Sequence, residues 1–391
     1  MGSELKTMYM NSKMDNLPIE GKLLFSILSD FLFQKKTEYT EISSDLIQLS
    51  ERHQVTPILY YQTKNKSCRN SYLYAISNYT QRKNNINEIK THLSQFQFCI
   101  IKGLSVSKYY PMPQLRTMGD CDIVVHESDK KAAGEILEAI GYKNITGECA
   151  FMEWHYEKNQ MDFELHHRLL YDEPVNTELE KEFCDTSWKY VIDSELDPSF
   201  HFVYLIIHLK KHLMNNGVGI RQFFDLAILS KYADLNGNRI KDFLLQVKLE
   251  KFAGICASLC HRWFGVILPV DEISITDEFY LYATKTILDD GVFGFDAPKN
   301  GVRSTLNSIN SRGRVQVLMD FLFPSYRVYS QTLKYGWIKG KPFLLPFMYI
   351  YRLFDVVNNH KVLYSVKHVN EIVSSSKALN EMNELFELWG L

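Results

Sequence analysis

Apolar residues in the first quarter of the chain recur every three or four positions. This spacing puts them on one side of a helix, so it predicts helices over about 18–93. One of these helices is expected over 43–63. Short polar side chains accept hydrogen bonds from the free N–H groups of a first helical turn, which makes Ser43, Ser44 and Asp45 the candidates for its start.

Between about 95 and 172 the apolar period shortens to two residues. Such alternation is typical of strands, whose side chains point to opposite faces in turn. The pattern predicts two short strands, a helix and a hairpin, over 96–103, 120–127, 128–142 and 149–170. The hairpin turn is expected at Asn159 and Gln160, a weaker turn pair than Asn-Gly.

After Pro174 the helical period returns and continues into the aromatic-rich last quarter. The most apolar stretch there, 341–357, contains Arg352 and Asp355 and is shorter than the roughly 20 residues that span a bilayer. We therefore predict a buried helix at this stretch and no transmembrane segment. The whole pattern indicates an α+β protein in three parts: an N-terminal helical region at 1–93, a small mixed β-sheet core at 94–175 and a C-terminal helical region at 176–391.

Composition narrows the class of protein. The chain has 391 residues, 46% hydrophobic and 23% charged, a balance that is ordinary for globular proteins. Its formal net charge of -2 provides no overall positive field for long nucleic acid. The seven cysteines are scattered, and 1–16 lacks the apolar core of a signal peptide, so we expect reduced thiols in a cytoplasmic protein. Cys256 and Cys260 have no second ligand pair, which favours core packing over zinc.

Two carboxylates stand at the entrance of the second predicted strand. Asp120 and Asp122 are one residue apart and therefore face the same way, and like charges so close repel unless a cation lies between them. On the later hairpin strand Asp162, Glu164 and His166 also share one face. If the two strands are neighbours, a third carboxylate joins the pair. Such oxygen-rich sites suit Mg²⁺ or Mn²⁺ bound together with substrate phosphates.

The core resembles the nucleotidyltransferases of the polymerase-beta type. Within them it is most similar to the bacterial group described as uncharacterised nucleotidyltransferases. Three stretches carry the resemblance: IIKG at 100–103, YYPMPQLRTMGDCDIVV at 109–125 and MDFELHHRL at 161–169. In that superfamily a glycine turn precedes an Asp-x-Asp pair, and a neighbouring strand supplies a third acidic residue.

The resemblance implies a role for each matching residue. Gly103 takes the place of the glycine turn, and Asp120 and Asp122 take the places of the catalytic metal-binding pair. Glu164 is the first choice for the third catalytic carboxylate and metal ligand, and Asp162 is the second. The implied reaction is transfer of a nucleoside monophosphate from a nucleoside triphosphate (NTP) to a hydroxyl group, with release of pyrophosphate.

The glycine turn departs from the family pattern. The best-known members have Gly-Ser or Gly-Gly, whereas this chain has Gly103 and Leu104 and a longer gap before the aspartates. Ser105 is the candidate replacement for the missing phosphate-binding serine. Lys102 and Arg116 are further candidates for nucleotide contacts, because cationic groups bind phosphate oxygens. The alternative for both is a salt bridge to the acidic cluster, and Lys102 could also only close its strand.

The helical segment after the core is similar to the corresponding part of the family. Lys211 and Arg221 are candidates to reach the triphosphate. Asp225 has two interpretations, a salt bridge with Arg221 or a base for the acceptor hydroxyl, and the salt bridge is favoured. His208 and His212 lie four apart on one helix face, so they either pack, line the active-site cleft or bind zinc, although no His-Glu-x-x-His motif is present.

We therefore expect a metal-dependent nucleotidyltransferase that acts on an unknown acceptor, a small molecule or a protein hydroxyl rather than long RNA. The altered glycine turn leaves open a catalytically inactive binding module of antitoxin-like or regulatory type, with a possible protein partner. A third interpretation is another metal-dependent phosphotransferase or hydrolase that uses the same carboxylates.

Overall fold

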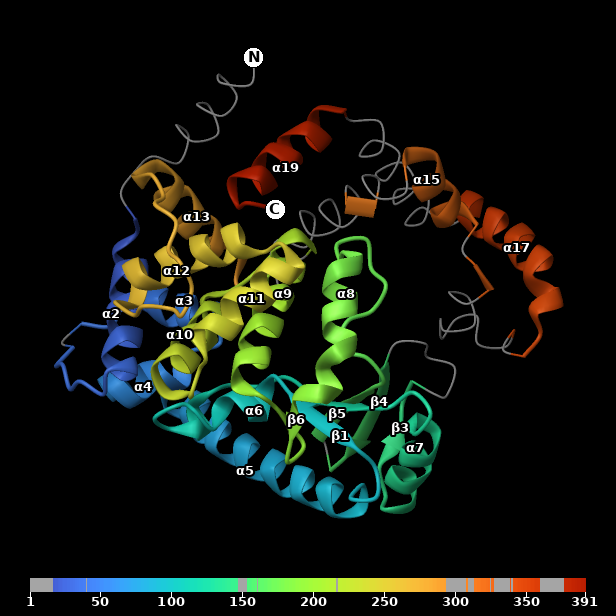
Figure 1. Ribbon diagram of the computed structural model, residues 1–391, viewed down its shortest axis with the longest axis horizontal. Helices are drawn as coiled ribbons and strands as arrows, with labels where there is room; N and C mark the ends of the chain where they lie inside the picture. Colours follow the sequence, from blue (N-terminus) through green and yellow to red (C-terminus); the bar gives the residue numbers. More distant parts are fainter. Residues whose placement is uncertain are drawn as a thin grey trace.

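The computed structural model describes most of the chain. The described residues are 17–39, 41–146, 153–159, 161–215, 217–292, 307–308, 313–323, 325–326, 338, 340–358 and 376–391. They form an α+β protein in which helices surround one mixed sheet (Figure 1). The predicted fold class is confirmed.

The sheet has seven strands in the order β3-β4-β5-β2-β1-β7-β6. Four of them are the predicted ones: β1 (Phe98–Ile101), β2 (Asp122–Val125), β4 (Glu153–Lys158) and β5 (Met161–His166). The pattern did not predict three two-residue strands: β3 (Lys143–Asn144), β6 (Val191–Ile192) and β7 (Glu195–Leu196). Strands β6 and β7 follow the predicted core range and come after the helix at Glu178–Asp185, so the sheet extends into the predicted C-terminal helical region.

Strand β2 lies at the centre of the sheet, antiparallel to β1 and parallel to β5. In this register Asp122 is opposite Glu164. Strands β4 and β5 form the predicted hairpin, with Lys158 opposite Met161. Asn159 in its turn has a φ of 54°, in the left-handed region that Asn tolerates better than most residues. The pairing of β2 with β5 is the arrangement on which the three-carboxylate prediction depends.

The two faces of the sheet meet different surroundings. Helices α5 (Arg69–His92) and α7 (Lys130–Ala139) cover one face, where Ile123 and Leu165 join their apolar cluster. Val124 faces the other side, toward the larger helical core. Helices α8 (Glu178–Asp185) and α9 (Pro198–Asn215) rise from that side (Figure 1). Alternation along β2 and β5 therefore sends Asp122 and Glu164 toward the helical half of the molecule.

The N-terminal helical pattern is confirmed, with one correction. Helices α2 (Ile19–Leu32), α3 (Ser44–Arg52) and α4 (Thr56–Thr63) and the short η1 (Lys66–Cys68) lead into α5. The single helix expected over 43–63 is two helices, because the chain turns between them at Gln54, whose φ is 55°. Ser43 caps the first of them and accepts a hydrogen bond from the Leu46 N–H at 3.1 Å.

The C-terminal helices pack into one core with the N-terminal ones. They include α10 (Ile220–Tyr232), α11 (Gly237–Val247), α12 (Glu250–Phe264) and α13 (Asp277–Asp290). Shorter turns lie around the sheet: α6 (Gly103–Ser107), η2 (Pro113–Leu115) and η3 (Thr186–Tyr190). Cys256 and Cys260 are fully buried in α12, so their predicted role in core packing is confirmed.

The last quarter contains α15 (Arg314–Leu322), η5 (Pro342–Leu344), α17 (Leu345–Asn358) and α19 (Ser376–Leu388). The prediction of a buried helix at 341–357 is wrong, since Phe343 is 71% exposed and Phe347 and Phe354 are each 65% exposed. Trp389, just after α19, is fully buried against Phe252 and Phe279 of the main core. Among the described helices, none combines the length and apolar character that crossing a membrane requires.

Candidate active site

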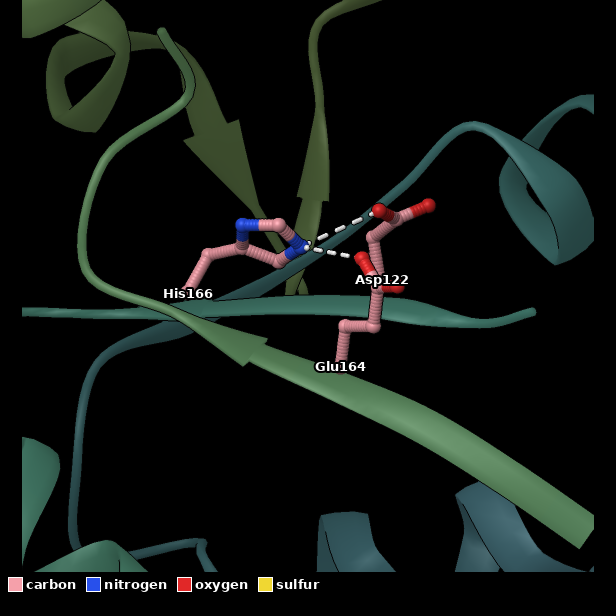
Figure 2. Close-up of side chains that lie close together, drawn as sticks. All are labelled: Asp122, Glu164 and His166. Carbon is pink, nitrogen blue, oxygen red and sulfur yellow. Dashed lines mark hydrogen bonds and ion pairs between the residues drawn. The ribbon is translucent and has the colours of Figure 1, made fainter. Parts of the chain in front are cut away.

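Two carboxylates and an imidazole meet where β2 and β5 lie side by side (Figure 2). Asp122 is opposite Glu164, and His166 follows two residues later on β5, so all three side chains leave the same face. His166 Nε2 lies 3.1 Å from Asp122 Oδ1 and 3.1 Å from Glu164 Oε2. The potential ligand atoms of the three residues lie within 4.8 Å of one another, close enough for one metal ion.

Lys102 forms a partly buried ion pair with Asp122. Its Nζ lies 2.9 Å from Asp122 Oδ1. Burial alone would raise the pKa of Asp122, but the charge of Lys102 and the contact with His166 outweigh it and hold that pKa well below its usual range. Burial would lower the pKa of Lys102, and Asp122 more than compensates, so the pKa of Lys102 is raised. Asp122 is therefore ionised and Lys102 protonated.

Glu164 and His166 stabilise each other's charged form. Burial would raise the pKa of Glu164, but its hydrogen bond with His166 outweighs burial and the pKa is lowered. Burial would likewise lower the pKa of His166, and the hydrogen bonds to Asp122 and Glu164 leave it raised. The charge of Lys102 and the hydrogen bonds with His166 together stabilise the ionised form of these two carboxylates.

Asp120 lies in the loop that precedes β2 and lines the same cavity as Glu164 and His166. The surrounding protein, and then the charge of Asp122, raise the pKa of Asp120, although the residue itself is exposed. A carboxylate beside other carboxylates gains from a nearby cation. The structure thus brings the first three predicted carboxylates to one place.

The fourth predicted carboxylate, Asp162, lies away from this cluster. Its side chain is 55% exposed, and its Oδ1 lies 3.4 Å from Nη2 of Arg82 on α5. Asp162 does not line the cavity. Arg82 also donates hydrogen bonds to the backbone carbonyls of Asp162 and Gly119. This arginine therefore ties the loop that carries Asp120 to the start of β5.

The glycine turn after β1 has a strained backbone. Lys102 has a φ of 53° and a ψ of -122°, a conformation that a residue with a side chain rarely adopts. Its N–H donates to His201 Nε2 at 3.2 Å, which holds the turn against α9. Gly103 follows at the start of α6. A Cβ there would lie 3.2 Å from Met118 Sδ and 3.5 Å from the Asp120 carbonyl oxygen, so glycine permits the close approach of this loop.

Two of the predicted phosphate ligands already have protein partners. The Ser105 hydroxyl is buried, donates to the Ile100 carbonyl at 2.7 Å, and does not line the cavity. It is therefore not placed where a phosphate-binding hydroxyl would face the carboxylates. Lys211 does line the cavity, and its Nζ lies 2.6 Å from Glu173 Oε1.

Arg116 and Asp225 form a buried, two-bonded ion pair. Arg116 Nε lies 2.9 Å from Asp225 Oδ1, and Nη2 lies 2.8 Å from Oδ2. The Tyr110 hydroxyl also donates to Oδ1 at 2.7 Å. Asp225 is thus in a salt bridge, as favoured from the sequence, but the expected partner Arg221 is wrong. The alternative ion pair of Arg116 with the acidic cluster is likewise replaced by this link to α10.

Arg221 is the arginine of the cavity that lacks a carboxylate partner. Its Nη1 donates to the Thr117 carbonyl at 2.9 Å and to the side chain of Gln54. Its Nε is buried and has no hydrogen-bond partner in the described part of the chain. No carboxylate of the described residues lies within ion-pairing distance of Arg221. Burial, and then the charge of Arg116, lower the pKa of Arg221 to about 10, so it remains protonated at neutral pH.

These groups surround a cavity of about 590 Å³ between the sheet and the helices. One wall is the strand end and the glycine turn, and the other is the inner side of α9 and α10. The basic side chains of the second wall are His208, Lys211, His212 and Arg221. They lie opposite the carboxylates of the sheet, and the same wall also contains Asp225, which is paired with Arg116.

Sequence reasoning missed three residues that contact this site. His201 precedes His208 by seven positions, or two helical turns, and this spacing was the available signal for it. Glu173 and Tyr171 lie in the irregular segment after β5, where no periodicity marks a residue. The Tyr171 hydroxyl lies 3.4 Å from His166 Nδ1, on the side of the ring away from the carboxylates.

The donor set fits a divalent cation. Asp122 and Glu164 offer carboxylate oxygens and His166 offers Nε2 from one compact cluster, and Asp120 lines the adjoining cavity. Carboxylates are the usual ligands of Mg²⁺ and Mn²⁺, and imidazole suits later transition metals. The ion pair with Lys102 and the hydrogen bonds with His166 show that these carboxylates require a neighbouring positive charge.

A model of the family described as "Uncharacterised nucleotidyltransferase" matches residues 42–265. The match is longer than half of the chain and runs from α3 to α12, with the whole sheet inside it. No curated protein and no solved structure matches this chain at a significant level.

Proposed function

The chain belongs to the uncharacterised nucleotidyltransferase family and is therefore a nucleotidyltransferase, and we propose that it transfers a nucleoside monophosphate from an NTP to an acceptor hydroxyl. The observation that carries this proposal is the cluster of Asp122, Glu164 and His166, two of which, Glu164 and His166, line the cavity together with Asp120. Pyrophosphate is the expected second product.

Asp120, Asp122 and Glu164 are the proposed catalytic carboxylates and would hold Mg²⁺ or Mn²⁺, with His166 as a neighbouring donor. When bound, the cation supplies charge stabilisation for the phosphate oxygens and lowers the pKa of an attacking hydroxyl. Lys102 contacts Asp122 in this structure and also lines the cavity, so its amino group lies beside both the carboxylate and the space that a phosphate would enter. We propose that Lys102 exchanges the first contact for the second.

The proposed path of the triphosphate runs from the carboxylates toward α9 and α10. Arg221 supports this direction, because its guanidinium lines the cavity without a carboxylate partner. Lys211 is the second cation on this wall, and Gly103 allows the loop that carries Asp120 to approach the turn on the opposite side. Arg116 lines the cavity too, but its guanidinium is held by Asp225, so it is not assigned a phosphate contact.

A catalytically inactive binding module is the second candidate. The Ser105 hydroxyl favours it, because it is engaged with Ile100 and the usual phosphate-binding serine has no replacement in the cavity. The four groups Lys102, Asp120, Asp122 and Glu164 favour catalysis instead. Hydrolysis or phosphotransfer would use the same carboxylates but would release orthophosphate or a phosphorylated product.

The test combines binding with product analysis. Calorimetric titration of each of the four NTPs, with and without Mg²⁺, is expected to show metal-dependent binding of a donor NTP by the wild type. The variant Asp120→Asn/Asp122→Asn should lose this binding and all pyrophosphate release. Asp162→Asn is the matched control, since it removes a carboxylate that does not line the cavity. Unchanged turnover in the double variant would refute the mechanism, and orthophosphate as the product would refute nucleotidyl transfer.

Three wider properties complete the proposal. We propose that 94–175 forms the catalytic core and that the flanking helical regions complete the cleft. The acceptor is proposed to be a small molecule or a protein hydroxyl, because the net charge of -2 gives little attraction for long nucleic acid. A cytoplasmic location is supported by the six described cysteines, all of which are free thiols.

A further inference from the structure

Two histidines of α9 meet inside the cavity without a role in the carboxylate cluster. His208 and His212 are one helical turn apart and both line the cavity wall. Their Nε2 atoms lie 3.2 Å apart, a hydrogen-bonding distance. One ring must therefore donate an N–H to the Nε2 of the other ring, which in turn carries its own proton on Nδ1.

That Nδ1–H has no protein acceptor. Within the described part of the chain, neither Nδ1 atom of the pair forms a hydrogen bond. The pair therefore brings a donor to the cavity wall that a bound ligand can use. The ring of Tyr204, a turn earlier on α9, packs beside His208 and fixes its orientation from one side.

The charged groups around the histidine pair indicate whether a bound ligand would be a cation or an anion. Burial lowers the pKa of both histidines, and Lys102, Lys211 and Arg221 lower it further, to about 3 for His212. Lys102 and Lys211 are paired with Asp122 and Glu173, so their charges are largely balanced. Arg221 has no carboxylate partner among the described residues and is the net positive group beside the pair. It repels a divalent cation and attracts an anion.

We propose that His208 and His212 form a hydrogen-bonding subsite for the terminal phosphates of the NTP, with Arg221 and Lys211 beside them. This inference rests on the proposed function and extends it, because it assigns the polyphosphate to the α9 wall. The carboxylates hold the reacting end of the donor, and the histidine pair holds the leaving pyrophosphate end. The pair is therefore a phosphate subsite rather than a zinc site.

Inorganic tripolyphosphate in metal-free buffer is the probe that tests the subsite without a nucleoside or a reaction. Calorimetry should show that the wild type binds it and that His208→Asn/His212→Asn binds it about 10- to 100-fold more weakly, as expected when hydrogen bonds to a charged group are lost. His261→Asn is the matched control, because His261 is exposed on α12 and pairs with Glu272. It should bind as tightly as the wild type.

Two outcomes would overturn the proposed subsite. The first is a wild type that does not bind tripolyphosphate, and the second is a folded double variant that binds it with wild-type affinity. Binding of Zn²⁺ that the double variant loses would also overturn it and assign the pair to a metal. If the double variant does not fold, as judged by circular dichroism, His212→Asn alone is measured against the same criteria. Failure of the proposed function can be distinguished from failure of the subsite. In the first case the wild type would still bind tripolyphosphate, but no NTP would yield pyrophosphate.

Discussion

The N–H of Lys102 donates a hydrogen bond to Nε2 of His201, across 3.2 Å and 99 positions of sequence. Lys102 has a positive φ at this point, so an unusual backbone conformation is held by a side chain from α9. Burial, and then the charge of Lys108, lower the pKa of His201 to about 3, which keeps its ring neutral and able to accept. The helical half of the molecule thus positions the lysine that contacts Asp122.

The first prediction follows from this contact. His201→Phe removes the acceptor and leaves a buried N–H unpaired, which typically costs about 1–3 kcal/mol. We expect kcat for pyrophosphate release to fall about tenfold or more, while KM for the NTP changes little. His201→Gln, whose amide oxygen can accept the same hydrogen bond, should restore part of kcat. Equal losses in both variants would assign His201 a purely structural role.

The second prediction compares two acidic residues of β5 that lie two positions apart. Glu164→Gln should abolish Mn²⁺ binding, measured by calorimetry, because it removes a charged oxygen from the three-residue cluster. Asp162→Asn should bind Mn²⁺ within about threefold of the wild type, since its carboxylate is exposed and paired with Arg82. If Asp162→Asn loses the metal and Glu164→Gln keeps it, the assignment is reversed.

The third prediction concerns Asp225. Its carboxylate is buried and bonded to Arg116 and Tyr110, so Asp225→Ala leaves an uncompensated buried charge. Breaking such a pair typically costs about 3–5 kcal/mol, and chemical denaturation should show a loss of this size in the free energy of unfolding. If Asp225 instead acted as the base for the acceptor hydroxyl, Asp225→Ala would lose turnover while its free energy of unfolding stayed close to that of the wild type.

The fourth prediction is a dependence of stability on pH. His53 Nδ1 accepts the Ile220 N–H at 3.1 Å, and Nε2 lies 3.3 Å from the Leu288 carbonyl, so the buried ring is neutral and donates from Nε2. Burial lowers the pKa of His53 to about 3, against about 6.5 in an unfolded chain. The stabilisation is therefore complete above pH 6.5 and is lost as the pH falls from 6.5 toward 3.

The magnitude and the measurement follow from proton linkage. Each such histidine lowers the free energy of unfolding by roughly 1.4 kcal/mol per pH unit within that window. Urea denaturation at pH 7, 6 and 5 should show this decline, and His53→Asn should be less stable at pH 7 with a shallower slope. His261→Asn, on the surface, should keep the wild-type slope. An identical slope in His53→Asn would exclude His53 as a contributor.

The local pattern of the sequence predicted the strands and the face that carries the carboxylates. Alternation along β2 and β5 depends on neighbouring residues alone, and it placed Asp122, Glu164 and His166 correctly because successive strand side chains must point to opposite faces. The same local reasoning located the N-terminal helices and the cap at Ser43.

Contacts between distant segments were decided by the tertiary structure. Arg116 pairs with Asp225, and Asp162 with Arg82, because of how α10 and α5 pack against the core, and helical periodicity contains no information about that packing. Periodicity also does not distinguish an apolar helix that is buried from one that is exposed, which is why it wrongly predicted that α17 is buried.

Which residues share one strand face could therefore be predicted from the sequence, since that depends on bond geometry over a few residues. The groups that face those residues across the cavity could not be predicted in this way, because they come from distant segments. The basic wall of His208, Lys211 and Arg221 opposes the carboxylates because α9 and α10 pack over that side of the sheet. That arrangement depends on how the whole core buries its apolar surface, and no single segment encodes it.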